Sequence, residues 1–125
     1  LGMEGGPDPD NRRAMRWDWV ENNEIRAHYK TLAHLRGGND ALRLGAFHTW
    51  RAEDGGLYAY ERYTDTQHVL CVLNTGAEPI ETTLPLPQTL ANKQELTDLY
   101  TQKTLPVLQG GVPIKLDAFG GVILE

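Results

Sequence analysis

The sequence predicts an all-β fold, an antiparallel β-sandwich of Greek-key type, preceded by a loop and one α-helix. Three observations predict this fold. Residues 1–19 are interrupted by glycines and prolines and have neither helical nor strand periodicity. Residues 23–36 have the periodicity of a helix. From about residue 44 onward, short strand-like runs alternate with turn signals.

The helix is predicted over residues 23–36. Asn22 or Asn23 begins it, because an Asx side chain accepts a hydrogen bond from a free backbone N–H at a helix start. Gly37-Gly38 ends it, and we expect the left-handed conformation there. The apolar residues fall on one face of a 3.6-residue period. They are Ile25, Tyr29, Leu32 and Leu35.

The first three strands follow in order. Residues 46–52 and 57–63 flank Asp54-Gly55-Gly56, which is a hairpin signal. Thr64-Asp65-Thr66 then turns the chain into residues 68–74. This last run is almost entirely apolar, so we expect a central strand that is covered on both faces.

The remaining strands complete a set of about seven or eight. Residues 80–86 alternate in polarity and are flanked by prolines, which is typical of an edge strand. Pairs of glycines separate the strands that follow. Those strands are predicted at residues 96–101, 112–116 and 122–124.

Composition excludes several classes of function. At 125 residues the chain has the length of one domain, and its net charge of −5 argues against a nucleic-acid partner. The longest apolar run, Val69–Leu73, is too short to span a membrane, and Cys71 has no second cysteine to pair with. His28 and His34 are six residues apart, the wrong spacing for one metal on a helix. We therefore expect no metal, no cofactor, no membrane association and a cytoplasmic location.

Several segments carry a family resemblance. Residues 2–18 read GMEGGPDPDNRRAMRWD, the predicted helix ends in a Leu-Arg pair, and Ala41-Leu42-Arg43-Leu44-Gly45 follows. Together they resemble the C-terminal third of the α-amylase family of glycoside hydrolases, in particular its neopullulanase, cyclomaltodextrinase and maltogenic amylase subgroup. The DPDNRR…M.WD motif is the specific part. The similarity continues through three later segments, at residues 58–62, 69–74 and 119–124.

The resemblance implies a domain organisation. In that family a (β/α)8 barrel is followed by an antiparallel β-sandwich called domain C. Residues 1–43 would be the end of the barrel, with a substrate-side loop at 1–19 and the last barrel helix at about 23–36. Residues 44–125 would be domain C. One departure is Ala14, where many relatives have proline, which loosens the loop.

The resemblance also implies that this chain has no catalytic residue of its own. Retaining glycosidases need two carboxyl groups about 5–5.5 Å apart. In this family these groups come from earlier barrel strands, which the sequence does not contain. We therefore expect that the chain alone does not hydrolyse a glycosidic bond.

Asp8 and Arg12 are the candidate substrate-binding residues. A carboxylate accepts from two neighbouring sugar hydroxyls, and a guanidinium donates through a planar fork. Pro7 and Pro9 restrict the backbone on either side of Asp8. The resemblance implies that Asp8 and Arg12 contact a glucose unit on the non-reducing side of the cleaved bond. The alternative is a set of exposed ion pairs that serve only the turn.

Asp10 with Arg13 and Asp18 with Arg16 are the obvious members of such a set of surface pairs. Asp8 and Asp10 are not expected to act as a catalytic pair, because nothing apolar shelters either carboxyl group.

The aromatic residues leave two alternatives open. Trp17 and Trp19 could stack on a sugar ring, although anchoring of the loop is the favoured interpretation. Four residues of the sandwich could form a sugar-binding platform, with packing inside the sandwich or against the barrel favoured instead. They are Trp50, Tyr58, Tyr60 and Tyr63.

Two function hypotheses follow. The first is a C-terminal portion of an α-glucan-hydrolysing enzyme, which stabilises the barrel and contributes part of a sugar subsite. Its partners would be an α-glucan or maltooligosaccharide and the catalytic barrel. The alternative is a stand-alone carbohydrate-binding or structural β-sandwich, and a protein-interaction module is weaker still. In the full enzyme the apolar helix face would lie against the barrel strands, and in the chain without a barrel it would pack on the sandwich or drive self-association. That face consists of Ile25, Tyr29, Leu32 and Leu35.

Overall fold

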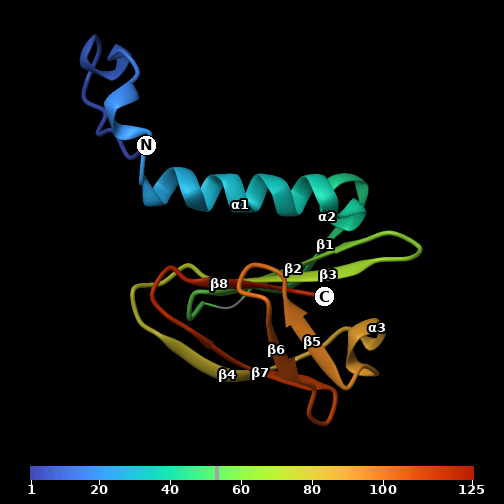
Figure 1. The fold of residues 1–125 in the computed structure, drawn as a ribbon. Coiled ribbons are helices and arrows are strands. Elements are labelled where there is room, and N and C mark those ends of the chain that lie inside the picture. The colour runs from blue at the N-terminus through green and yellow to red at the C-terminus, as the bar shows by residue number, and fades with distance from the viewer. Residues whose placement is uncertain (53) are drawn as a thin grey trace. The chain divides into compact units, whose positions relative to one another are not determined.

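The computed structural model describes residues 1–52 and 54–125 (Figure 1). The chain divides into an N-terminal unit, Leu1–His34, and a C-terminal unit, Leu35–Glu125. Helix α1, Glu24–Gly38, begins in the first unit and ends in the second. No helix within the described residues is both long and apolar enough to cross a membrane. The division at residues 43 and 44 into barrel remnant and sandwich stays a prediction.

The start of α1 confirms the capping prediction. Asn23 is the residue before the helix, and its Oδ1 accepts from the Arg26 backbone N–H at 2.8 Å. The Asn23 amide also donates to the Leu1 carbonyl at 3.1 Å. The same side chain therefore caps the helix and fastens the beginning of the chain to it.

The end of α1 differs from the prediction. The helix extends to Gly38, and neither Gly37 nor Gly38 is among the glycines with positive φ, so the expected left-handed stop is wrong. The chain instead leaves the helix at Asn39, which has φ −123° and ψ 115°. The Asn39 Oδ1 accepts from the Leu42 N–H and so starts a second helix, α2, Asp40–Leu44, which the sequence does not predict.

The C-terminal unit contains eight strands within its described residues. The first three have the predicted bounds, whereas β6 and the short helix α3, Gln88–Ala91, were not predicted. The strands are β1 (Ala46–Ala52), β2 (Leu57–Tyr63), β3 (His68–Asn74), β4 (Ile80–Pro85), β5 (Glu95–Asp98), β6 (Lys103–Pro106), β7 (Gly111–Leu116) and β8 (Gly121–Leu124).

These strands form two antiparallel sheets. The larger sheet has the order β1-β2-β3-β8-β5-β6, and the smaller one pairs β4 with β7. Figure 1 shows β4 and β7 as a layer of their own, across from β1, β2, β3 and β8. Apolar side chains from both sheets make one core, including Leu70 of β3, Leu84 of β4 and Ile114 of β7. The predicted fold, a β-sandwich preceded by a helix, is confirmed.

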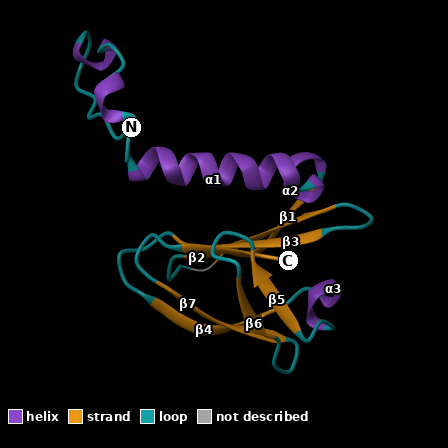
Figure 2. Cartoon of the chain, in the orientation of Figure 1, coloured by secondary structure: helices purple, strands orange, loops and turns teal. Residues whose placement is uncertain are grey.

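Strand β3 is covered on both faces, as predicted. Leu70 and Val72 point into the core between the sheets. Val69 and Cys71 point the other way and form a second cluster with Ala41 and Leu42 of α2. Figure 2 shows α2 beside β1 and β3, on the side away from β4 and β7. Leu35, at the end of α1, packs against this second cluster.

A buried carboxylate connects three strands. The Glu61 side chain on β2 is only 7% exposed. Its Oε2 accepts from His48 Nδ1 on β1, and its Oε1 accepts from His68 Nε2 on β3, both at 2.6 Å. The Thr89 hydroxyl of α3 lies 2.9 Å from the other ring nitrogen of His68. Because both carboxylate oxygens have a donor, Glu61 is tolerated inside the sandwich.

We expect Glu61→Ala to lower the free energy of unfolding by about 2–4 kcal/mol, since two charge-assisted hydrogen bonds are lost and two imidazoles lose their acceptor. The matched control is Glu81→Ala on β4, whose side chain is 76% exposed and only 3.5 Å from Lys115. Urea unfolding of the whole chain measures both variants. Equal midpoints for wild type and Glu61→Ala would show that this cluster does not stabilise the sandwich.

Candidate functional site

The structure brings Asp8 and Arg12 together. Asp10–Arg12 form a 3-10 turn, in which the Asp10 N–H donates to the Pro7 carbonyl at 2.8 Å. The turn brings the Arg12 side chain against that of Asp8. Arg12 Nε lies 2.7 Å from Asp8 Oδ1, and Arg12 Nη2 lies 3.2 Å from Asp8 Oδ2. The Arg12 side chain is 74% exposed and the Asp8 side chain is 58% exposed. The predicted pair is therefore present as a two-point ion pair at the surface.

This arrangement leaves hydrogen-bonding capacity for a ligand. Each oxygen of the Asp8 carboxylate has a further lone pair, and Nη1 of Arg12 makes none of the hydrogen bonds to Asp8. Because both groups are exposed, their mutual attraction is weak and a sugar hydroxyl can compete for either one. The pair can thus accept from one hydroxyl and donate to another on the same sugar ring.

Two further ion pairs lie in the same segment. Arg13 binds both oxygens of Asp10, at 2.8 and 2.6 Å, and Arg16 binds both oxygens of Asp18. All four side chains are about half-exposed. The hydrogen bonds with Arg16 lower the pKa of Asp18 below its usual value, and they raise that of Arg16. These pairs are surface pairs, as the alternative interpretation stated, and pairing geometry alone does not distinguish Asp8–Arg12 from them.

The tryptophans of the loop differ in their surroundings. Trp17 is 76% exposed and Trp19 is 40% exposed. The guanidinium of Arg16 lies 4.4 Å from the centre of the Trp19 ring, within the range of a cation–π interaction. Trp19 therefore packs with the Arg16–Asp18 pair, whereas Trp17 offers its ring to solvent. Sugar stacking and domain anchoring both stay predictions for Trp17.

The four sandwich aromatics do not form one platform. Tyr58 and Tyr60 point to the face of the large sheet away from the core, and their ring centres are 5.7 Å apart. Tyr63 has the opposite parity on β2 and stacks on His68 instead. Trp50 donates from its indole N–H to the Pro85 carbonyl, toward the smaller sheet. The platform of four, the alternative that the sequence disfavoured, does not form because side chains alternate along a strand, and Trp50 packs against the sandwich core as favoured.

Phe47 is the member that sequence reasoning missed. Its ring centre lies 5.3 Å from that of Tyr60, and it is 57% exposed. Only the register of β1 on β2, which pairs Phe47 with Arg62, places it on the same face as the tyrosines. We call Phe47, Tyr58 and Tyr60 the aromatic face.

Tyr60 is the anchored residue of the aromatic face. Partial burial raises the pKa of Tyr60 to about 12, and a hydrogen bond with Cys71 contributes to the rise. Burial also raises the pKa of Cys71, whose side chain lies within the second cluster. Cys71 is thus a buried thiol with little thiolate character, as predicted.

The Tyr60 hydroxyl should titrate near pH 12 and not near the ordinary value of 10.0. Because the folded pKa is the higher one, the contribution of this group to stability is complete below about pH 10 and is lost as the pH rises toward 12. Tyrosinate absorbance, combined with Tyr60→Phe, measures this group. Tyr29→Phe, which alters a 69% exposed ring, is the control. If Tyr60→Phe removes a tyrosinate absorbance step near pH 10, the raised pKa of Tyr60 is wrong.

Metal ligation finds no support in the described residues. No group of three His, Cys, Asp or Glu side chains within them is arranged to hold a metal ion.

Comparison with known proteins assigns the C-terminal unit. The family model described as Maltogenic Amylase, C-terminal domain, matches residues 47–123. Neopullulanase 2 of Thermoactinomyces vulgaris is 33% identical over 126 residues, which are 99% of this chain and 21% of that protein. The chain therefore spans about a fifth of the length of this relative.

Solved structures show the same fold. Ttha1563 of Thermus thermophilus matches with a TM-score of 0.85 and 28% identity, over 100% of this chain and 26% of that one. An α-amylase of Geobacillus thermoleovorans, solved in complex with acarbose, matches with a TM-score of 0.81 and 24% identity, over 98% of this chain and 26% of that one. Since the family model covers most of the sandwich, the chain belongs to the family of maltogenic amylase C-terminal domains.

Proposed function

We propose that this chain is the C-terminal part of an α-glucan-hydrolysing enzyme, in which it stabilises a catalytic barrel and contributes Asp8 and Arg12 to a sugar subsite. The match of residues 47–123 to the maltogenic amylase C-terminal domain is the observation that carries the proposal. The substrate class is supported by the relative that is named a neopullulanase, which matches over almost the whole of this chain.

The stabilising role rests on apolar surface that the chain leaves uncovered. Phe47 of the aromatic face is 57% exposed, Leu44 of α2 is 71% exposed, and Ile25 and Tyr29 of α1 are 45% and 69% exposed. Burial of one such side chain contributes about 1.5–3 kcal/mol. In our proposal a barrel covers these groups, and the two domains stabilise each other.

The subsite role rests on the loop. Asp8 and Arg12 are held against each other by a short turn, and each has spare hydrogen-bonding capacity. The pair suits a sugar because a ring offers adjacent hydroxyls that both donate and accept. Chemistry at the glycosidic bond needs two further carboxyl groups, which the rest of the enzyme supplies in this proposal.

In the enzyme that joins this chain to a catalytic barrel, we expect Asp8→Ala and Arg12→Ala each to lower kcat/KM for maltooligosaccharides by about 10- to 100-fold, the value of one hydrogen bond to a charged group. The matched controls are Asp10→Ala and Arg13→Ala, which break an ion pair in the same loop. Release of reducing ends measures the rates. If the control variants lower kcat/KM as much as the Asp8 and Arg12 variants do, Asp8 and Arg12 have only a structural role in the loop.

We also propose that the exposed face of α1 causes self-association when the chain is produced without a barrel. Leu35 already packs on the chain's own second cluster, so Ile25 and Tyr29 supply most of the remaining apolar surface.

Ile25→Glu combined with Tyr29→Glu should convert an associated chain into a 14.0 kDa monomer. Lys30→Glu, a charge change on the same helix, is the control and should leave association unchanged. Sedimentation velocity distinguishes the species. A wild-type chain that sediments as a monomer at every concentration would refute self-association through this face.

A further inference from the structure

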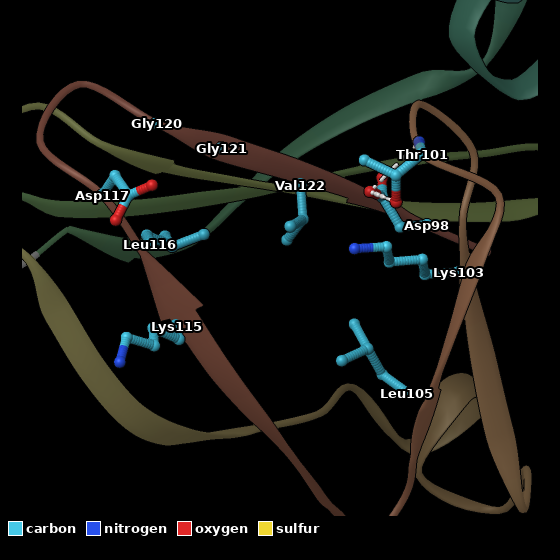
Figure 3. Close-up of a pocket in the computed structure, with 10 residues that line it drawn as sticks. All are labelled: Asp98, Thr101, Lys103, Leu105, Lys115, Leu116, Asp117, Gly120, Gly121 and Val122. Atoms are coloured by element: carbon cyan, nitrogen blue, oxygen red, sulfur yellow. Dashed lines mark hydrogen bonds between the residues drawn. The ribbon is translucent and has the colours of Figure 1, made fainter.

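A cavity of about 390 Å³ opens between the two sheets of the sandwich, at the edge formed by β6 and β7 (Figure 3). Its residues come from β5, β6, β7, β8 and the loops after β5 and β7. This volume lies at the small end of the range of ligand sites, so it suits a compact ligand of one or two rings. All of its lining residues belong to the C-terminal unit.

The floor of the cavity is apolar. Leu105, Leu116 and Val122 line it, and Leu116 is only 2% exposed. Leu105 and Val122 are half-buried, so each presents part of its side chain to the cavity. An apolar floor favours a ligand that has one face of C–H groups.

The walls add one available cation and one available anion. Lys103 extends its ammonium group into the cavity from one side, and Asp117 lies at the other side (Figure 3). Within residues 1–52 and 54–125, neither side chain forms an ion pair. One donor group and one acceptor group therefore lie on opposite walls of the cavity, on either side of an apolar floor.

The other charges of the walls already have partners. The Asp98 carboxylate accepts from the backbone N–H groups of Tyr100, Thr101 and Ile123 and from the Thr101 hydroxyl. The Lys115 ammonium lies 3.5 Å from Glu81. Because what remains is balanced, the site favours a neutral ligand with hydroxyl groups over an anion or a cation.

An exposed aromatic residue lies in the loop beside the cavity. Phe119 stands between the lining residues Asp117 and Gly120 in the sequence and is 74% exposed. Its φ of 57° is uncommon for a bulky residue, and its N–H donates to the Gly76 carbonyl at 3.1 Å. Phe119 itself is not a lining residue of the cavity.

We propose that this cavity binds a pyranose unit of a neutral saccharide, with Lys103 and Asp117 holding its hydroxyls and Leu105 and Val122 lying under its ring. The choice of an α-glucan as that saccharide rests on the proposed function. The sandwich would then have a glucan-binding site separate from the subsite of Asp8 and Arg12.

Amide NMR of the 125-residue chain, titrated with maltose to about 100 mM, tests the proposal. We expect saturable shifts at Thr101, Lys103, Gly120 and Val122, with a Kd of about 1–10 mM. Lys103→Ala and Asp117→Ala should each raise the Kd at least about fivefold, since each removes a hydrogen bond to a charged group. Lys93→Ala, at an exposed lysine outside this cavity, is the matched control and should leave the Kd unchanged.

The same spectra show whether each variant is folded, and Val122→Phe, which fills the floor, provides a second variant that should abolish the shifts. The proposal is overturned if maltose leaves these amides unmoved or shifts only those of residues 8–12. It is also overturned if inorganic phosphate binds at the cavity and maltose does not. The proposed function fails separately, through unchanged kcat/KM in the Asp8 and Arg12 variants of the barrel-bearing enzyme.

Discussion

The burial of strand β3 on both faces is the constraint on which the rest of the structure depends. Leu70 and Val72 fill the core between the sheets, while Val69 and Cys71 need a second cover, which Ala41 and Leu42 of α2 provide. A strand with four buried apolar residues in a row would otherwise expose half of them to water. The short helix is therefore part of the sandwich, and it fixes the end of α1 through Leu35.

Two buried carboxylates complete this arrangement because each has its hydrogen-bond partners. Glu61 joins β1, β2 and β3 through two histidines, and Asp98 joins β5 to β8 and to the following turn through four donors. An unpaired carboxylate at either position would be costly. These contacts also define register, because each carboxylate reaches its partners in one alignment of the strands only.

Much of the fold could be predicted from the sequence, and the failures have physical causes. The bounds of β1, β2 and β3 follow from alternating or continuous apolar runs between strong turn signals. Helices α2 and α3 and strand β6 are too short for any period to be visible. The aromatic face could not be assembled from the sequence, since strand register decides that Phe47 joins Tyr60. Asp8 and Arg12 were identified from the family motif, and a turn was expected in this loop, but its 3-10 form and the direct ion pair between Asp8 and Arg12 were not predicted.

The C-terminal unit is a scaffold organised around one doubly covered strand, and the sugar contacts that we propose lie on this scaffold and in the loop that precedes it in the sequence. Native-state hydrogen exchange of the whole chain tests the central claim most directly. We predict that the amides of Val69–Leu73 exchange only through global unfolding, and that Leu42→Ala accelerates them by the full amount of its destabilisation. Amides of β3 that exchange as fast as those of the two-stranded sheet, or that do not respond to Leu42→Ala, would contradict it.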